Sequence, residues 1–142
     1  LRIRAHSESA AQVADFLADH PAVTRVIYPG RQEGVAKTRA DTYLTGGYGG
    51  LVGFELADGA DAGRRFIDAL KLFYHVANIG DARSLAIHPA TTTHSQLAPE
   101  EQALSGVSPG YVRLSIGIEH IDDILGDLDQ ALTVGGQRVA AE

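Results

Sequence analysis

A chain of 142 residues with 44% hydrophobic and 21% charged residues has the length and composition of one soluble globular domain. The net charge of −6 argues against a nucleic-acid partner, which selects for a basic surface. The absence of cysteine excludes disulfides, thiol chemistry and cysteine-based zinc sites, and no apolar run approaches the ~18 residues of a membrane span. We therefore expect a cytoplasmic protein. The sequence also contains no methionine, and we expect it to be a segment of a longer polypeptide.

Apolar periodicity and β-branched alternation predict the regular elements of the chain. In chain order these are a helix capped by Ser7 and ended by Pro21, strands over 23–28 and 51–57, a helix over 61–72, a short strand over 74–79, a helix over 99–104, a strand over 111–117 and a helix over 121–132. Strands and helices mix without a regular βαβ order. We therefore predict an α+β fold, with a small, mainly antiparallel sheet and helices packed on one of its faces.

Four stretches lack a clear period. The polar stretch 31–41 is left open between a loop and a short helix, and 80–97 is expected to be a long loop. The glycine-rich stretch 46–50 lacks the ending of a phosphate-binding loop, and it is expected to turn and pass close to another part of the chain. The tail over 135–142 is expected to be flexible.

Arg113 is the residue that the pattern singles out. In YVRLSIG, residues 111–117, the apolar side chains of Val112, Leu114 and Ile116 point to one face of the predicted strand, so Arg113 points to the other. A guanidinium offers two parallel donors that fit a carboxylate. The pattern alone leaves two interpretations open, a solvated arginine on a strand and a carboxylate-binding arginine.

The other polar residues give weaker signals. His88 and His94 match no common metal-ligand spacing, so we expect hydrogen-bonded loop histidines and no metal site. Ser84 lacks the G-x-S-x-G context of a nucleophile and is instead interpreted as a hydroxyl or backbone donor to a ligand. Lys37 and Lys71 are the amines that could form a Schiff base, and nothing near either one predicts a lowered pKa.

Three motifs in order carry a resemblance to a known family. The segments ADFLADHPAVTRVIYPG, NIGDARSLAIHPATTTHSQL and GYVRLSIGIEHIDDILGDLDQAL resemble the cysteine/methionine-metabolism family of pyridoxal-phosphate enzymes. This resemblance implies the C-terminal domain of a fold-type I enzyme, with a domain over 1–134 and a tail over 135–142. The family's cofactor-binding lysine, in a Ser-x-Thr-Lys context, has no match here, so the large cofactor-binding domain and its Schiff-base lysine are expected outside this sequence.

The resemblance also implies the roles of individual residues. In the family's R-L-S-x-G-x-E motif the arginine binds the substrate α-carboxylate, which would be Arg113 here. Ser84 and Leu85 match the Ser-Leu pair that helps to hold the same carboxylate. No catalytic or cofactor-binding residue is expected in this chain, which alone should be inactive and bind no cofactor, although the intact enzyme would use pyridoxal phosphate.

The run GDARSLAIHP with the following TTTHSQL is similar to the O-acetylhomoserine sulfhydrylase branch, because Arg83 stands where several lyases and cystathionine synthases have glutamate. This branch makes homocysteine and acetate from O-acetylhomoserine and sulfide, a step of methionine biosynthesis. The alternatives are another enzyme of the family (a methionine γ-lyase or a cystathionine synthase or lyase) and a free-standing amino-acid-binding domain. The expected partners are an amino-acid substrate, the large domain and, as the family implies, the other subunits of a homotetramer.

Overall fold

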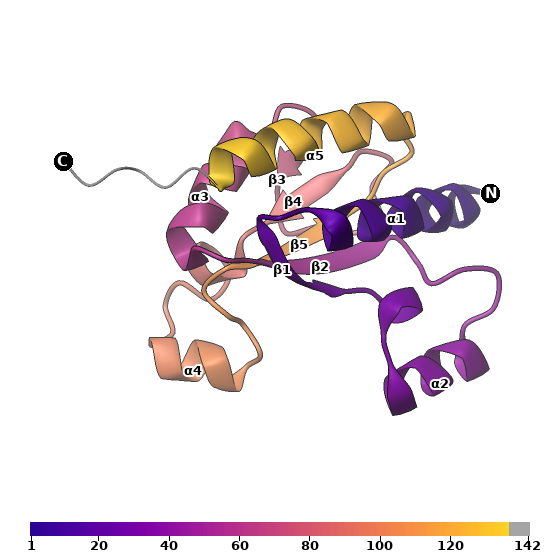
Figure 1. Cartoon of the computed structure of the whole chain (residues 1–142), viewed down its shortest axis with the longest axis horizontal. Coiled ribbons are helices and arrows are strands. Elements are labelled where there is room, and N and C mark those ends of the chain that lie inside the picture. The colour runs from indigo at the N-terminus through magenta and orange to yellow at the C-terminus, as the bar shows by residue number, and fades with distance from the viewer. Residues whose placement is uncertain (137–142) are drawn as a thin grey trace.

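A five-stranded sheet forms the centre of the computed structural model, which describes residues 1–136 (Figure 1). Its strands, in spatial order, are β1 (Val23–Ile27), β2 (Leu51–Leu56), β5 (Tyr111–Ser115), β4 (Leu85–Ile87) and β3 (Tyr74–His75). Neighbouring strands are antiparallel except β3 and β4, which are parallel. The predicted small, mainly antiparallel sheet is therefore confirmed.

Three helices cover one face of this sheet, as the amphipathic patterns predict (Figure 1). They are α1 (Arg2–Asp19), α3 (Gly59–Ala69) and α5 (Ile121–Gly135). In α5, Ile124, Leu128 and Leu132 recur at helical spacing and are all fully buried. Burying side chains of this size stabilises the fold by about 1.5–3 kcal/mol each.

The core lies between these helices and the sheet. Val112 and Leu114 of β5 are fully buried, and Phe54 of β2 meets Phe66 of α3 edge to face, with ring centroids 5.3 Å apart. Two further helices, α2 (Gly34–Tyr43) and α4 (Pro99–Leu104), lie away from this layer (Figure 1). The helices on the sheet therefore leave its second face for other contacts.

The N-terminal helix differs from the prediction. It begins at Arg2, so Ser7 is not its cap but a buried residue of its second turn, 5% exposed. The helix extends because its buried face starts earlier, at His6, whose Nδ1 lies 2.6 Å from the carbonyl oxygen of Ile116. This tertiary contact overrides the local capping signal of Ser7.

Helix α3 ends at Ala69 and not at residue 72. The carboxylate of Asp127, on α5, accepts hydrogen bonds from the backbone N–H groups of Lys71, Leu72 and Phe73. These bonds replace the helical ones and turn the chain toward β3, which is shorter than predicted.

The structure shows what three of the stretches without a clear period form. The stretch 31–41 contains most of α2, and the predicted loop over 80–97 contains β4, a strand that the pattern misses. Gly47 has φ 128°, and a Cβ added to it would lie 2.7 Å from Cβ of Ser7. The glycine-rich stretch therefore does pass close to another segment, as predicted, and that segment is α1.

The C-terminal helix runs to Gly135. The predicted tail over 135–142 falls almost entirely on residues 137–142, which lie outside the described residues. Within the described part of the chain, no helix combines the length and the hydrophobicity needed to cross a bilayer.

Candidate functional site

Arg113 projects from the face of the sheet that α1, α3 and α5 leave open. Burial alternates along β5, where Val112 and Leu114 face the helices and Arg113 is half-buried on the other side. One guanidinium nitrogen, Nη2, donates to the carbonyl oxygen of Ala77 at 2.6 Å. No carboxylate in residues 1–136 forms an ion pair with Arg113. The orientation predicted from the alternation is confirmed, and the side chain is a partly desolvated cation without a counter-charge.

The chain between β3 and β4, residues 76–84, crosses this open face, and we call it the crossing loop. Beyond the Arg113 bond to Ala77, the hydroxyl of Ser115 accepts a hydrogen bond from the backbone N–H of Gly80 at 3.0 Å. Farther along, the carbonyl oxygen of Ala82 accepts from the N–H of Ile118 at 2.9 Å. Ala77, Gly80 and Ala82 thus each attach the crossing loop to β5 or its following turn, and the first of these contacts is made by Arg113.

Ser84 ends the crossing loop and is fully buried. Its backbone N–H donates to Oε1 of Glu119 at 2.7 Å, and its hydroxyl donates to Oε2 of Glu119 at 2.9 Å. The Ser84 oxygen also accepts from the backbone N–H of Gly117 at 2.8 Å. Both donors of Ser84 are thus engaged within the chain, and its predicted contact with a substrate stays a prediction.

Leu85 begins β4 and lies beside β5. It pairs with Ser115 in the register of the sheet, while Ile87 pairs with Arg113. The Leu85 side chain is 4% exposed and packs inside the protein, so a ligand would meet its backbone rather than its side chain. The fold therefore places Leu85 on the strand next to that of Arg113, and Ser84 directly before it.

Tyr111 shares the open face with Arg113. A Cβ added to Gly53, on β2, would lie 2.8 Å from the Tyr111 hydroxyl oxygen, so the tyrosine ring occupies the space that the glycine leaves. Burial raises the pKa of Tyr111, and the nearby positive charge of Arg113 opposes this shift. Tyr111 therefore stays a neutral phenol beside the guanidinium.

The two loop histidines have structural partners. His88 is 1% exposed, with Nδ1 2.8 Å from the Thr91 hydroxyl and Nε2 2.7 Å from the Pro109 carbonyl oxygen. Burial lowers the pKa of His88, which favours a neutral ring that donates to Pro109 and accepts from Thr91. His94 meets the hydroxyl of Thr93 at 2.9 Å. Residues 1–136 contain no group of three metal-binding side chains.

The lysines of this chain do not fit a Schiff-base site. Lys37, on α2, donates to both carboxylate oxygens of Asp41 at 2.7 and 2.6 Å, and this hydrogen bonding raises the pKa of the exposed Lys37 amine. A protonated amine is not a nucleophile. Lys71 is exposed after α3, and its backbone N–H is bound to Asp127.

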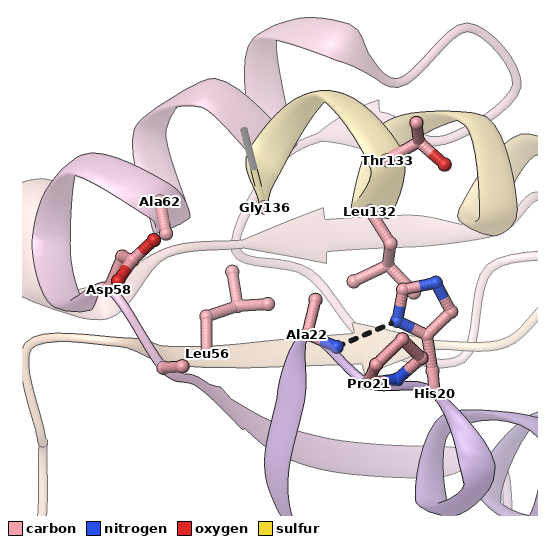
Figure 2. A pocket seen from close by; sticks show the side chains of 10 residues that line it. His20, Pro21, Ala22, Leu56, Asp58, Ala62, Leu132, Thr133 and Gly136 are labelled. Atoms are coloured by element: carbon pink, nitrogen blue, oxygen red, sulfur yellow. Dashed lines mark hydrogen bonds between the residues drawn. The ribbon is translucent and has the colours of Figure 1, made fainter. Parts of the chain in front are cut away.

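The hollow shown in Figure 2 lies elsewhere on the molecule. It has a volume of about 440 Å³ and lies between the start of β1, the end of β2 and the C-terminal turn of α5. His20 lines it and accepts a hydrogen bond from the N–H of Ala22 at 3.2 Å. It contains none of the predicted site residues, so a ligand of Arg113 would bind outside it.

Sequence reasoning missed Glu119 and Ser115 as parts of this site. Both belong to the R-L-S-x-G-x-E motif, where the pattern drew attention to the arginine alone. The spacing of Gly117 and Glu119 was the available signal. A Cβ on Gly117 would meet Oε2 of Glu119 and would lie 2.5 Å from the backbone nitrogen of Ser84.

Comparison with known proteins agrees with this architecture. A family model described as the Cys/Met metabolism PLP-dependent enzyme matches residues 1–133. The O-acetyl-L-homoserine sulfhydrylase of Leptospira meyeri is 52% identical over 133 residues, 93% of this chain and 30% of that protein. The L-methionine gamma-lyase of Pseudomonas putida is 48% identical over 132 residues, 93% of this chain and 33% of that protein.

A solved structure is also similar. The crystal structure assigned to an O-acetylhomoserine (thiol)-lyase of Campylobacter jejuni, with N′-pyridoxyl-lysine-5′-monophosphate, matches with a TM-score of 0.86 and 41% identity. The match covers 93% of this chain and 31% of that chain. The chain thus spans about a third of the length of the proteins that it resembles.

Proposed function

Because this chain belongs to the Cys/Met metabolism PLP-dependent enzyme family, we propose that it is the substrate-binding C-terminal part of an O-acetylhomoserine sulfhydrylase. The intact enzyme would replace the acetate of O-acetylhomoserine with sulfide and so form homocysteine. The proposal is supported by the names of the relatives, since sulfhydrylases from Leptospira meyeri and Thermus thermophilus are 52% and 49% identical to the chain.

The observation that carries the proposal is the state of Arg113. A half-buried guanidinium without a carboxylate partner in residues 1–136 is held on the open face by one bond to the Ala77 carbonyl oxygen. A partly desolvated charge gains most from a charged partner, and a substrate α-carboxylate matches its paired donors. Arg113 would bind this carboxylate and hold the α-carbon at a fixed angle to the reacting groups.

The cofactor belongs to another part of the enzyme in this proposal. Pyridoxal phosphate supplies an electron sink for chemistry at the α-carbon of an amino acid. This chain's contribution is to bind and orient the carboxylate end of the substrate through Arg113, beside Ser84 and the strand that begins at Leu85. We further propose a domain over 1–134, a cytoplasmic location and a homotetrameric assembly for the full-length enzyme.

The 142-residue chain alone is expected not to bind pyridoxal phosphate covalently, because the sequence lacks the family's Ser-x-Thr-Lys motif and the amine of Lys37 is paired with Asp41. Incubation with the cofactor, followed by borohydride reduction and mass spectrometry, measures this. A full-length enzyme treated in the same way is the positive control and should carry one adduct per chain. A stoichiometric adduct on Lys37 or Lys71 would show that the cofactor site is wrongly assigned.

The activity itself is tested with the full-length enzyme. We expect homocysteine formation from O-acetylhomoserine and sulfide to exceed α,γ-elimination of methionine in kcat/KM. The relative named methionine gamma-lyase, at 48% identity, makes the second reaction the competing assignment. Assays of both reactions on one preparation decide between them, and a higher kcat/KM for methionine elimination would replace the proposal with the lyase.

A further inference from the structure

Both carboxylate oxygens of Glu119 accept hydrogen bonds from within the chain, unlike those of a solvated surface carboxylate. Its two carboxylate oxygens accept separate bonds from Ser84, Oε1 from the backbone N–H at 2.7 Å and Oε2 from the hydroxyl at 2.9 Å. Hydrogen bonds to a charged acceptor are about twice as strong as neutral ones. The pair therefore joins the residue before β4 to the turn after β5.

The surroundings fix this pair in place. The N–H of Gly117 donates to the Ser84 oxygen, and the Ser84 carbonyl oxygen accepts from the N–H of Tyr74, on β3, at 3.0 Å. Gly117 has no side chain at the position where one would meet the backbone of Ser84. Ser84 is thus held by the turn after β5 and by β3, and both of its donors are bound to Glu119.

The same loop reaches Arg113 at its other end. Ala77, near the start of the crossing loop, accepts the bond from Nη2 of Arg113, and Gly80 is bound to Ser115. A loop fixed at Ser84 presents the Ala77 carbonyl in one position. This carbonyl turns one edge of the guanidinium toward the loop and leaves the remaining N–H groups for a carboxylate.

We propose that Glu119 is a positioning residue for substrate binding, which acts through Ser84 and the crossing loop to orient the guanidinium of Arg113. The proposal rests on the proposed function, since it assigns to Arg113 the binding of a substrate carboxylate. Ser84 serves in it as the anchor of the loop. Without the Glu119 contacts the guanidinium of Arg113 is less ordered before the substrate binds, which weakens binding. Arg113 still holds the carboxylate of the bound substrate with both donors, so the chemistry of the bound substrate is unchanged.

The test uses the full-length enzyme with Glu119→Gln, Ser84→Ala and the double variant. A glutamine at 119 is uncharged and has one acceptor oxygen, so it cannot accept from both donors of Ser84, and the charge-assisted bonds are lost. We expect KM for O-acetylhomoserine to rise about tenfold in Glu119→Gln, with kcat within about twofold, as for an interaction that is equal in the ground and transition states. KM for sulfide, which has no carboxylate, should stay the same.

The double variant tests whether Glu119 acts through Ser84. KM for O-acetylhomoserine should be no higher in Ser84→Ala/Glu119→Gln than in the more impaired of the two single variants, because both substitutions break the same hydrogen-bonded unit. The matched control is Glu101→Gln, a glutamate whose Oε2 also accepts a loop N–H, that of Ala98 at 2.9 Å. Glu101 belongs to α4, which lies away from the sheet (Figure 1). This control should leave both KM values unchanged.

An unchanged KM for O-acetylhomoserine, an equal rise in both KM values or additive effects in the double variant would each overturn the proposal. If Glu119→Gln does not fold, Glu119→Asp takes its place, since it keeps the charge and withdraws the carboxylate from the two donors of Ser84 by one methylene. Arg113→Ala separates the positioning role of Glu119 from the carboxylate site itself. If it raises KM while Glu119→Gln does not, the positioning role is wrong, and if neither does, the carboxylate site itself is wrong.

Discussion

Replacing Arg113 with alanine is expected to lower kcat/KM of the full-length enzyme for O-acetylhomoserine by roughly 30- to 1000-fold. The substitution removes a charge-assisted, partly desolvated pair, worth about 2–4 kcal/mol. Part of the loss should appear in kcat, because a loosely held carboxylate lets the α-carbon leave its productive angle. Steady-state kinetics of the variant measure the effect.

Two companion variants sharpen this experiment. Arg113→Lys keeps the charge but loses the two-pronged geometry, so its kcat/KM should remain well below that of the parent enzyme. Arg64→Ala removes an exposed arginine of α3 that pairs with Asp61 at 2.7 Å, and it should have no effect on kinetics. The melting temperature of Arg113→Ala should change little, since its one bond is to Ala77. A collapsed melting temperature would mark Arg113 as structural, and an unchanged kcat/KM would remove it from the site.

The largest effect on stability is expected at Asp127. Asp127 is 8% exposed. Its carboxylate accepts hydrogen bonds from the backbone N–H groups of Lys71, Leu72 and Phe73 and from the side-chain amide of Gln130. Asp127→Ala leaves one buried and two partly buried N–H groups without this acceptor, and desolvated donors without partners are costly. We expect a loss of about 3 kcal/mol in the free energy of unfolding, or roughly 10 °C in melting temperature.

Thermal and urea unfolding of the 142-residue chain measure this loss. Asp129→Ala is the matched control, because Asp129 lies two residues away on α5 and its side chain is 63% exposed, 4.0 Å from His20. A pair at 4.0 Å with one exposed partner is worth about 0–1 kcal/mol, so the free energy of unfolding of the control should stay close to that of the parent. Equal destabilisation by the two variants would contradict the role of Asp127 as an acceptor for the turn after α3.

Patterns within one segment predicted most of the fold. The alternation in 111–117 predicted both β5 and the direction of Arg113, and the apolar stripe after residue 121 predicted α5. The helix bounds that were predicted wrongly depend on residues far away in the sequence. The helix start at Arg2 depends on the contact between His6 and Ile116, and the end of α3 depends on Asp127, more than fifty residues later in the chain.

The candidate site also has a part that the sequence predicts and a part that depends on the folded chain. The residue pattern and the resemblance together singled out Arg113, and the resemblance added Ser84 and Leu85. Neither could predict that β4 would form in a stretch without a period, because three residues are too few for an alternation to be recognised. The pairing of Ser84 with Glu119, 35 residues apart, follows from β4 lying beside β5 and needs the folded chain.

The two outer strands affect how this chain meets other chains. The strand β3 has only two residues, and the guanidinium of Arg83 lies 4.3 Å from the ring centroid of its Tyr74. At the other margin of the sheet, β1 has a register shift between Val23 and Arg25, and it carries the charged, exposed side chain of Arg25. Short, bulged and charged outer strands are poor templates for strand addition. Aggregation by edge-to-edge growth of the sheet is therefore disfavoured at both margins.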